Sequence, residues 1–368
     1  MSEVLATPGP GAYIDDLLAR VVELGGSDLH LTSGAPPLVR INGDLRRLAE
    51  YPRLTSPEIQ RLLEPVLKPH HLEQFEQNQE LDLGYGVEGL GRFRVNVFFQ
   101  RGSVGSVMRV IPSELRTFDE LGLPEIVGGF ADLPSGLVLV SGPAGSGKST
   151  TLAALLDRIN STRPAHVMTI EDPIEFLHRH NQSIVNQREV GQDTRSFAEA
   201  LRHVMRQDPD VILVGELPAA ETVRTALIAA ETGHLVFAAL HAQDTAQAID
   251  RIGDMFPSEQ QQQIRFLLGN ALAGVVTQQL VPRANRLGRT VAAEVLVVDG
   301  DIRRLVREGA TDQLPALIAA SEHLGMQSME QSLAEQVLHG TITLEVAVER
   351  TLHADAVRRM VGDALIRV

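Results

Sequence analysis

The chain has 368 residues, of which 43% are hydrophobic, and its formal net charge is −14. This length is sufficient for two domains with a large buried core, and the hydrophobic content is typical of a globular protein. The absence of cysteine excludes disulfides, thiolate metal sites and cysteine nucleophiles, and the acidic balance argues against a nucleic-acid partner, which would need a basic surface.

The N-terminal segment shows no basic stretch followed by an apolar one, and no run of about 18 apolar residues occurs in the chain. We therefore expect no signal peptide and no transmembrane helix. The lack of cysteine also suits a reducing compartment.

The N-terminal part, residues 1–112, is predicted to be a mixed α+β domain. Residues 13–26 carry apolar side chains at spacings of three and four and end in Gly25-Gly26, which indicates a helix with a glycine stop. Later segments alternate and are separated by glycine, which indicates antiparallel strands. In order, we expect strands over 27–34 and 37–43, a helix over 56–78 that begins at Ser56-Pro57, and strands over 81–87, 91–102 and 103–112. Turn-forming residues then predict a linker at 113–118.

From residue 119 the pattern changes to short, continuous apolar runs that alternate with helices. Such runs are typical of strands buried on both faces of a parallel sheet, which predicts an α/β domain over 119–368. The expected strands are 136–142, 166–172, 210–216 and 234–240, with one further strand at 289–298. The rest of the chain from residue 258 is helical in pattern, and we expect a helical C-terminal region over about 286–368.

The segment Gly142–Thr150 has the pattern of a phosphate-binding loop, Gly-x-x-x-x-Gly-Lys-Ser. An apolar strand precedes it and an apolar-periodic helix follows it, as the motif requires, and this context disfavours an ordinary glycine-rich turn. Backbone N–H groups of such a loop bind phosphate oxygens, Lys148 would neutralise the β- and γ-phosphates of ATP, and the Ser149 hydroxyl would bind Mg²⁺. The predicted nucleotide-binding residues are Gly142, Pro143, Ala144, Gly145, Ser146, Gly147, Lys148, Ser149 and Thr150.

Lysine is scarce in this chain. Of 33 basic residues only Lys68 and Lys148 are lysine, and the others are arginine. Because lysine is a compact charge on a flexible stem and arginine is a planar fork, Lys148 is a candidate for a site that arginine cannot fill.

Polar residues follow the expected strands of the second domain at their carboxyl ends, where ligands bind in open α/β sheets. Glu175 follows the second of these strands, Glu216 ends the third, and His234 and His241 begin and follow the fourth. Alone, an acid at such a place is more often a helix cap, and a histidine more often a satisfied polar group. Beside a phosphate loop we predict catalytic roles for Glu175 and Glu216, with Glu216 binding Mg²⁺ through water or orienting the attacking water. For the two histidines a catalytic role and a structural one stay open.

Four segments occur in the order and spacing of one known family: GPAGSGKST, TIEDPIEFLH, LRHVMRQDPDVILVGE and TGHLVFAALH. With them the chain resembles the type II/IV secretion ATPase superfamily, and within it the type IV pilus retraction ATPases. The N-terminal segments GGSDLHLTSGAPPLVRINGDLRRL and GRFRVNVFFQRG are similar to those of the same group, so the resemblance covers nearly the whole chain. Assembly ATPases of the superfamily usually carry a four-cysteine zinc module, whose absence here favours the retraction branch.

The resemblance implies a hexameric ring that hydrolyses ATP at the base of a pilus machine. It implies a PAS-like N-terminal domain and a RecA-like core that pivot about the linker, so that closure over nucleotide becomes displacement. Arg94 and Arg109 match family arginines that would stabilise charge on the phosphates, although the residues alone favour plain surface charges on neighbouring strands. The implied partners are further copies of the chain and a pilus platform protein in the inner membrane. The implied location is the cytoplasm, at the inner face of the cytoplasmic membrane.

The segment after Glu216 departs from the family pattern. Family members usually have GE-x-RD-x-ET, whereas this chain has Pro218 and Ala219 in place of Arg and Asp, and Ala242 in place of a Thr. We expect Pro218 in the first turn of a helix, which leaves the fold intact. Three functions stay open: an active retraction motor, a slow accessory ATPase that joins a second retraction ATPase, and a RecA-like helicase or DNA-transfer ATPase, which the net charge disfavours.

Overall fold

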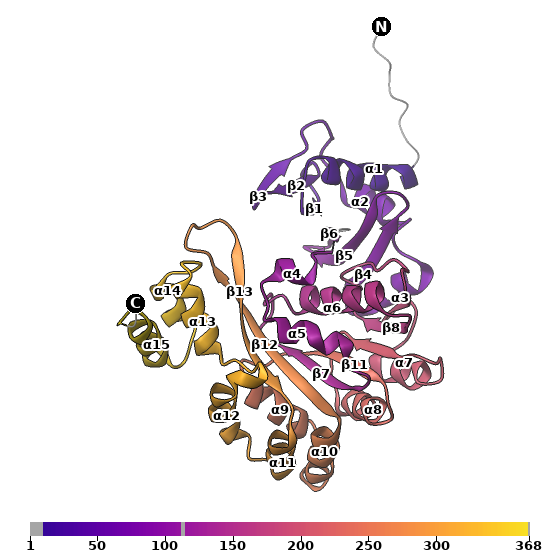
Figure 1. Ribbon diagram of the computed structural model, residues 1–368. Helices are drawn as coiled ribbons and strands as arrows, with labels where there is room; N and C mark the ends of the chain where they lie inside the picture. Colours follow the sequence, from indigo (N-terminus) through magenta and orange to yellow (C-terminus); the bar gives the residue numbers. More distant parts are fainter. Residues whose placement is uncertain (1–9, 112–114, 367–368) are drawn as a thin grey trace. The chain divides into compact units, whose positions relative to one another are not determined.

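The structure is a computed structural model that describes residues 10–111 and 115–366 (Figure 1). The chain divides into two compact units, one comprising Met1–Glu114 with Pro173–Leu177, and the other comprising Leu115–Asp172 with His178–Val368. The predicted linker at 113–118 falls partly outside the described residues, and from residue 115 the chain leads into the short helix α4 (Phe118–Leu121). No helix in the described ranges is long and apolar enough to cross a membrane.

The first unit is a six-stranded antiparallel sheet in the order β3-β2-β1-β6-β5-β4, with helices packed against it. Its strands are β1 (Asp28–Leu31), β2 (Leu38–Ile41), β3 (Asp44–Arg47), β4 (Glu80–Val87), β5 (Gly91–Gln100) and β6 (Ser103–Ile111), and its first helix is α1 (Pro10–Glu23). On β5 the side chains of Phe93, Val95 and Val97 are fully buried and share one core with Leu17 and Leu18 of α1. The intervening side chains lie on the other face of the sheet, because a strand has a period of two.

The prediction of one helix over 56–78 is wrong, because two helices, α2 (Ser56–Leu63) and α3 (Pro69–Asn78), occupy this segment. Between them Lys68 has φ −68° and ψ 162°, which is extended backbone. A residue that precedes proline is driven out of the helical region, so Pro69 ends any continuation of α2 and starts a new helix. Strand β3 is not predicted from the sequence either, because all four of its residues are exposed.

The second unit is built on a seven-stranded sheet in the order β13-β12-β7-β11-β10-β8-β9. Its strands are β7 (Gly136–Ser141), β8 (His166–Glu171), β9 (Ile184–Glu189), β10 (Val211–Val214), β11 (Leu235–Leu240), β12 (Leu272–Pro282) and β13 (Arg289–Val297). Neighbouring strands are parallel except for β12 and β13, which form an antiparallel pair at one edge. The five strands predicted for this part of the chain are confirmed, whereas β9 and β12 are unexpected.

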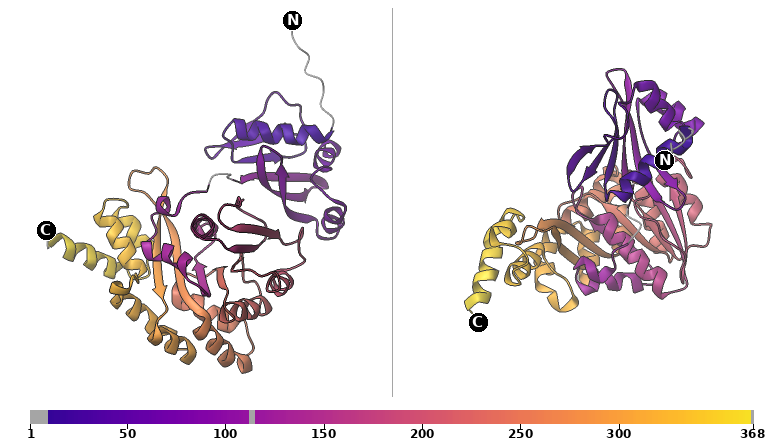
Figure 2. Two further views of the ribbon diagram at one scale, coloured as in Figure 1. Left: turned by 45° about the vertical axis from the view of Figure 1, so that its right-hand side comes forward. Right: turned by 90° about the horizontal axis from the view of Figure 1, so that it is seen from above.

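Helices cover both faces of this sheet (Figures 1 and 2). Alternate residues of β7 face two separate cores, Leu137 and Leu139 facing one, and Val138 and Val140 facing the other. The helices are α4, α5 (Glu125–Gly129) and α6 (Lys148–Thr162) on one side, and α7 (Phe197–Val204), α8 (Ala220–Glu231), α9 (Thr245–Asp254), α10 (Ser258–Ala271), α11 (Gly300–Glu308) and α12 (Leu314–Ala320) on the other. Burial on both faces explains the continuous apolar runs, and the predicted α/β fold is confirmed.

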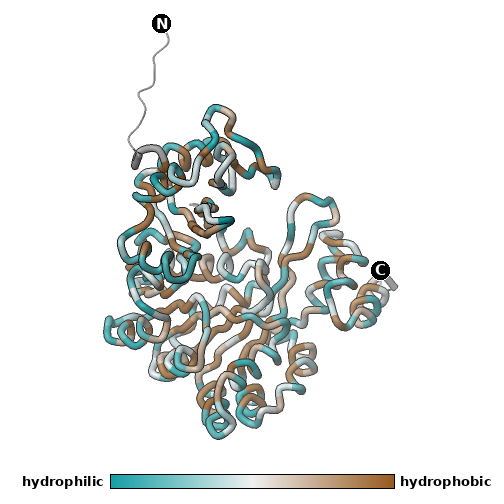
Figure 3. The backbone as a smooth tube through the Cα atoms, turned by 180° about the vertical axis from the view of Figure 1, so that it is seen from behind, coloured by the Kyte–Doolittle hydropathy of each residue, from teal (hydrophilic) through white to brown (hydrophobic). Residues whose placement is uncertain are grey.

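The last helices, α13 (Met329–Leu338), α14 (Leu344–Glu349) and α15 (Ala354–Ile366), form a small core of their own. This core includes Val281 and Ala292, which belong to β12 and β13. Colouring by hydropathy shows hydrophobic strands in the interior and helices that alternate hydrophobic and hydrophilic residues (Figure 3). The edge strand β13 and its neighbour β12 thus connect the main sheet with the C-terminal helices.

Candidate active site

The loop between β7 and α6 has the backbone shape that binding of an anion requires. Gly142 has φ +142° and Gly147 has φ +94°, both in the region that favours glycine. A Cβ atom on Gly142 would lie 2.2 Å from the backbone oxygen of Gln278, so a larger residue cannot occupy this position. Helix α6 begins at Lys148, and its first N–H groups, which lack partners within the helix, are available to an anion.

Lys148 is buried, and its ammonium group lies among acceptors. Nζ donates hydrogen bonds to the carbonyl oxygens of Gly142 at 2.9 Å and Pro143 at 3.0 Å, and it lies 3.3 Å from Nδ1 of His241. Because an ammonium group only donates, the lone pair of His241 Nδ1 faces it, and the ring proton belongs on Nε2. A planar guanidinium does not match these positions, which explains a lysine in a chain that otherwise uses arginine.

Glu216 and His241 follow the neighbouring parallel strands β10 and β11, so both reach the same edge of the sheet. Nε2 of His241 lies 3.7 Å from Oε1 of Glu216, and about half of each side chain is exposed. The ring of His241 thus lies between Lys148 and Glu216. The structure brings these three predicted residues together at the loop, and it gives His241 a place in the site.

Two hydroxyl groups of the loop remain available to a ligand. Oγ of Ser146 is buried without a hydrogen-bond partner, and Ser149 is half-buried in the first turn of α6. A buried hydroxyl without a partner indicates a missing polar group, because such groups are nearly always satisfied in native proteins. Together with the glycine backbone and the Lys148 charge, these hydroxyls fit the phosphates of a nucleotide.

The backbone after His241 is held on two sides. The amide of Ala242 donates to Oγ of Ser141 at 3.1 Å, the same hydroxyl lies 3.2 Å from the Ala242 carbonyl oxygen, and Arg251 donates to the carbonyl oxygen of His241 at 2.7 Å. These contacts use only the backbone of residue 242. The backbone contacts that hold residue 242 do not depend on its side chain, so they are compatible with the Thr usual in the family.

His234 lies at the opposite end of β11. Its Nδ1 is 2.9 Å from the carbonyl oxygen of Ala229, near the end of α8, and its own carbonyl accepts a hydrogen bond from Gly136. A strand of six residues such as β11 spans about 17 Å, so His234 does not reach the loop that His241 contacts. A catalytic role for His234 beside this loop does not fit this position, and of the two roles left open, its contacts favour the structural one, at the turn between α8 and β11.

Glu175 belongs to the segment Pro173–Leu177, which groups with the first unit and not with the phosphate loop. Its side chain is exposed. Glu171, at the end of β8, accepts hydrogen bonds from Thr169 at 2.6 Å and Gln187 at 3.1 Å. The segment TIEDPIEFLH (residues 169–178) is therefore divided between the two units, since Pro173–Leu177 belongs to the first and its flanks to the second.

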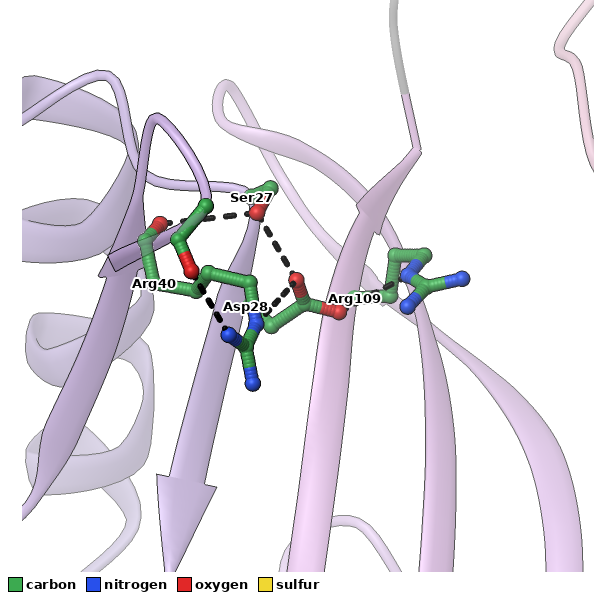
Figure 4. A network of polar contacts seen from close by, with 5 residues as sticks. Ser27, Asp28, Arg40 and Arg109 are labelled. Carbon is green, nitrogen blue, oxygen red and sulfur yellow. Dashed lines mark hydrogen bonds and ion pairs between the residues drawn. The ribbon is translucent and has the colours of Figure 1, made fainter. Parts of the chain in front are cut away.

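Arg94 and Arg109 lie directly opposite each other on β5 and β6 of the first unit. Like charges at such positions repel, and each arginine has an acid beside it: Arg94 Nε is 3.6 Å from Asp82, and Arg109 Nε is 2.7 Å from Asp28. Asp28 is almost fully buried between Arg40 and Arg109, and the terminal nitrogens of Arg109 point away from it (Figure 4). The guanidinium of Arg109 therefore remains largely exposed and is accessible to an anion.

The Asp28 carboxylate is ionised despite its burial. Burial raises the pKa of this carboxyl, but the hydrogen bond from Ser27 and the hydrogen bond and charge of Arg109 together lower the pKa below its usual range. Ionised Asp28 thus fixes one side of Arg109 at neutral pH.

A second buried acid, Glu294 of β13, lies opposite Thr277 of β12 and accepts a hydrogen bond from the amide of Thr245 at 2.8 Å. Burial raises the pKa of the Glu294 carboxyl, the bonds from Thr245 oppose this, and the charges of Asp244 and Glu330 raise the pKa further. Since the folded pKa lies above the unfolded one, the folded state holds more protons, and the contribution of Glu294 to stability falls as pH rises toward the folded pKa.

Glu294→Gln is therefore expected to raise the free energy of unfolding at about pH 8, because the amide oxygen still accepts from Thr245 without a buried charge. The gain over wild type is expected to vanish below the ordinary glutamate pKa of 4.5. Urea unfolding of both proteins at several pH values measures the difference. A gain that is independent of pH would contradict this account of Glu294.

Several residues at the loop carry no motif and are missed from the sequence. Ser141 ends β7 as an ordinary polar residue, and Thr151 lies inside an apolar-periodic helix. Gln278 lies in β12, a strand that the sequence does not predict. The only signal is the pair Gln278-Gln279 within an apolar run.

Comparison with known proteins agrees with this geometry. The model of the family described as Type II/IV secretion system protein matches residues 13–349. The chain belongs to this family. The resemblance seen in the sequence is thereby confirmed, and the RecA-like α/β core agrees with it.

Among individual proteins, the chain is similar to ATPases of type IV pili. "Type IV pilus retractation ATPase PilT" of Pseudomonas aeruginosa is 45% identical over 337 residues, which are 92% of this chain and 97% of that protein. "Type IV pilus ATPase PilU" of the same organism is 40% identical over 347 residues, covering 94% and 91%. The crystal structure of the pilus retraction motor PilT with bound ADP has a TM-score of 0.86 and 47% identity, covering 94% of this chain and 98% of that one.

Proposed function

We propose that this protein is a motor ATPase that couples ATP hydrolysis to retraction of a type IV pilus. The observation that carries the proposal is that Lys148, His241 and Glu216 lie side by side at an intact phosphate loop. The chain is also similar over nearly its whole length to a retraction ATPase. Through His241, which follows β11, these contacts join Lys148 of the loop to Glu216, which follows β10. A phosphate-binding lysine and an acid that orients water are the groups that nucleotide hydrolysis uses.

The residues of the loop have separate roles in this proposal. Gly142–Thr150 would bind the phosphates of ATP, Lys148 would neutralise their charge, and Ser149 would hold Mg²⁺, which would supply charge stabilisation. Glu216 would orient the attacking water or hold the metal through water. The ring of His241 lies beside its carboxylate, with Nε2 at 3.7 Å from Oε1.

The first unit supplies further residues. Arg94 and Arg109 would stabilise charge on the phosphates, and Glu175 would act as a second catalytic acid. We place the protein in a homohexamer at the cytoplasmic face of the membrane, against a platform protein of the pilus. The sequence resemblance supports this placement.

Retraction in cells tests the proposal. Cells that lack this protein are expected to keep surface pili but to lose twitching, and the wild-type gene is expected to restore it. A gene carrying Glu216→Gln is expected not to restore twitching, at equal protein level. Normal twitching in cells that lack the protein, with no second retraction ATPase present, would contradict the proposed function.

A second candidate function is a slow accessory ATPase that works beside another retraction motor. It is favoured by the segment after Glu216, which lacks the Arg and Asp usual in the family. In this segment Leu217 is buried in the main core, and α8 begins at Ala220. Ala219 is the N-cap residue of α8, with extended backbone and no side-chain hydrogen bond. Pro218 therefore precedes the helix, and the expectation of proline in its first turn is wrong. The Asp usual in the family would fall on the N-cap, where it is a strongly preferred residue.

Pro218→Arg combined with Ala219→Asp is expected to raise turnover or cooperativity, roughly threefold or more, while the affinity for nucleotide stays nearly unchanged. Ala219→Ser is the control, because serine also caps α8 and should raise stability by about 1 kcal/mol without adding charge. Steady-state ATPase kinetics and thermal unfolding of the three proteins separate the two effects. A shift in affinity with no change in turnover would rule out this role for the segment.

A further inference from the structure

Gln278 is a buried side chain of β12 that contacts the phosphate loop and α6 at once. It is 1% exposed. Its Nε2 donates to the carbonyl oxygen of Ser146 at 2.8 Å, and its Oε1 accepts from the hydroxyl of Thr151 at 2.9 Å. Because the carbonyl oxygen of Ser146 can only accept, Nε2 of the amide must face it, and Oε1 is left to accept from the Thr151 hydroxyl.

The bond to Ser146 determines the orientation of a complete peptide group. In a trans peptide the carbonyl and the following N–H point in opposite directions, so a carbonyl of Ser146 held against β12 turns the N–H of Gly147 away from β12. This peptide leads into Gly147, the N-cap residue of α6, which has φ +94°, a conformation that few other residues adopt. Without an anchor, the Ser146–Gly147 peptide could rotate at little cost.

The same strand also contacts the beginning of the loop. The backbone oxygen of Gln278 would lie 2.2 Å from a Cβ atom on Gly142, and its Nε2 would lie 3.1 Å from one on Gly147. Both ends of the loop therefore rest against one residue of β12. That strand is paired with β7, from which the loop departs, so the support is rigid.

We propose that Gln278 is the positioning residue of the phosphate loop: it holds the Ser146–Gly147 peptide so that the Gly147 N–H faces the phosphates. The inference rests on the proposed function, because it assumes that the loop binds nucleotide. Gln278 does not touch the ligand, and it acts through the loop backbone. It is part of no motif that the sequence presents.

The neighbouring Gln279 provides a matched control. It is the same residue type on the same strand, but its side chain lies on the other side of the sheet, where Nε2 donates to the carbonyl oxygen of Arg350 at 2.8 Å. Gln279→Met removes one hydrogen bond to the C-terminal helices and none to the loop.

The test compares Gln278→Met with Gln279→Met in the full-length protein, using a fluorescent ADP derivative and steady-state ATP hydrolysis. Methionine keeps the length of the side chain but leaves Ser146 and Thr151 without their partner. We expect the Kd for ADP and the KM for ATP to rise together by about tenfold in Gln278→Met, with kcat lowered less than about threefold, since the loop binds ground state and transition state alike. In Gln279→Met both constants should stay within about twofold of wild type.

Gln278→Glu supplies a readout that a merely structural residue would not give. The protonated carboxyl can donate to Ser146, whereas the carboxylate can only repel its carbonyl oxygen. The affinity of this variant for ADP, divided by that of wild type, is therefore expected to fall as pH rises, and burial brings this fall toward neutral pH. If Gln278→Met fails to fold, this pH profile decides alone.

Wild-type affinity in Gln278→Met, or a pH-independent ratio in Gln278→Glu, would overturn the inference while leaving the proposed function intact. Absence of nucleotide binding by wild type would instead overturn both.

Discussion

Lys148→Arg is expected to lower ATP turnover by at least about 100-fold, although the substitution keeps the positive charge. Nζ of Lys148 is buried within hydrogen-bonding distance of two loop carbonyl oxygens and of His241. A guanidinium is larger and planar, so it would displace the loop or the imidazole ring. Because nucleotide phosphates bind at the same place, the Kd for ADP should rise as well.

The other lysine of the chain provides the control for this prediction. Lys68 is exposed in the first unit, between α2 and α3, and Lys68→Arg should leave turnover and affinity unchanged. Phosphate release and titration with labelled ADP measure both variants. Turnover by Lys148→Arg within about tenfold of wild type would show that charge alone suffices at this position.

Glu216→Gln is expected to lower kcat by at least about 100-fold while the Kd for ADP changes less than threefold. The amide keeps the size of the side chain but loses the charge that orients water or metal. Glu216 faces Nε2 of His241 at 3.7 Å, and the His241 ring separates it from Lys148, so binding of phosphate by the loop should persist.

Glu221→Gln is the matched control for Glu216→Gln. Glu221 lies five positions further along the chain, in the first turn of α8, and pairs with Arg202 at the surface. Its substitution should have little effect on either constant, since exposed ion pairs contribute little. Equal loss of kcat in both variants would point to a general effect of charge and would contradict a special role of Glu216.

The sequence alone predicts those parts of the structure that depend on local pattern. The strands β7, β8, β10 and β11 are mostly apolar runs because cores lie on both faces of their sheet. The phosphate loop is recognisable because its glycines must adopt conformations that other residues avoid. Each of these signals is contained within a few neighbouring residues of the chain.

What the sequence could not predict depends on distant contacts. Leu272, the first residue of β12, follows directly on the last residue of α10, with no turn residue to mark the change. The sequence places His241 after β11 and His234 before it, but the contact of His241 with Lys148 is seen only in the structure. The role of Gln278 requires knowing that β12 lies beside β7. Likewise, the surroundings of Asp28 and Arg109 follow only from the pairing of β1 with β6.

The central claim is that the loop, Lys148 and Glu216 form a working ATPase, and one measurement tests it most directly. Phosphate release by the purified full-length protein is measured with Mg²⁺ and ATP, next to a Lys148→Ala variant prepared in the same way. We predict steady turnover by the wild type and none above background by the variant. Wild-type release no faster than that of Lys148→Ala would contradict the account.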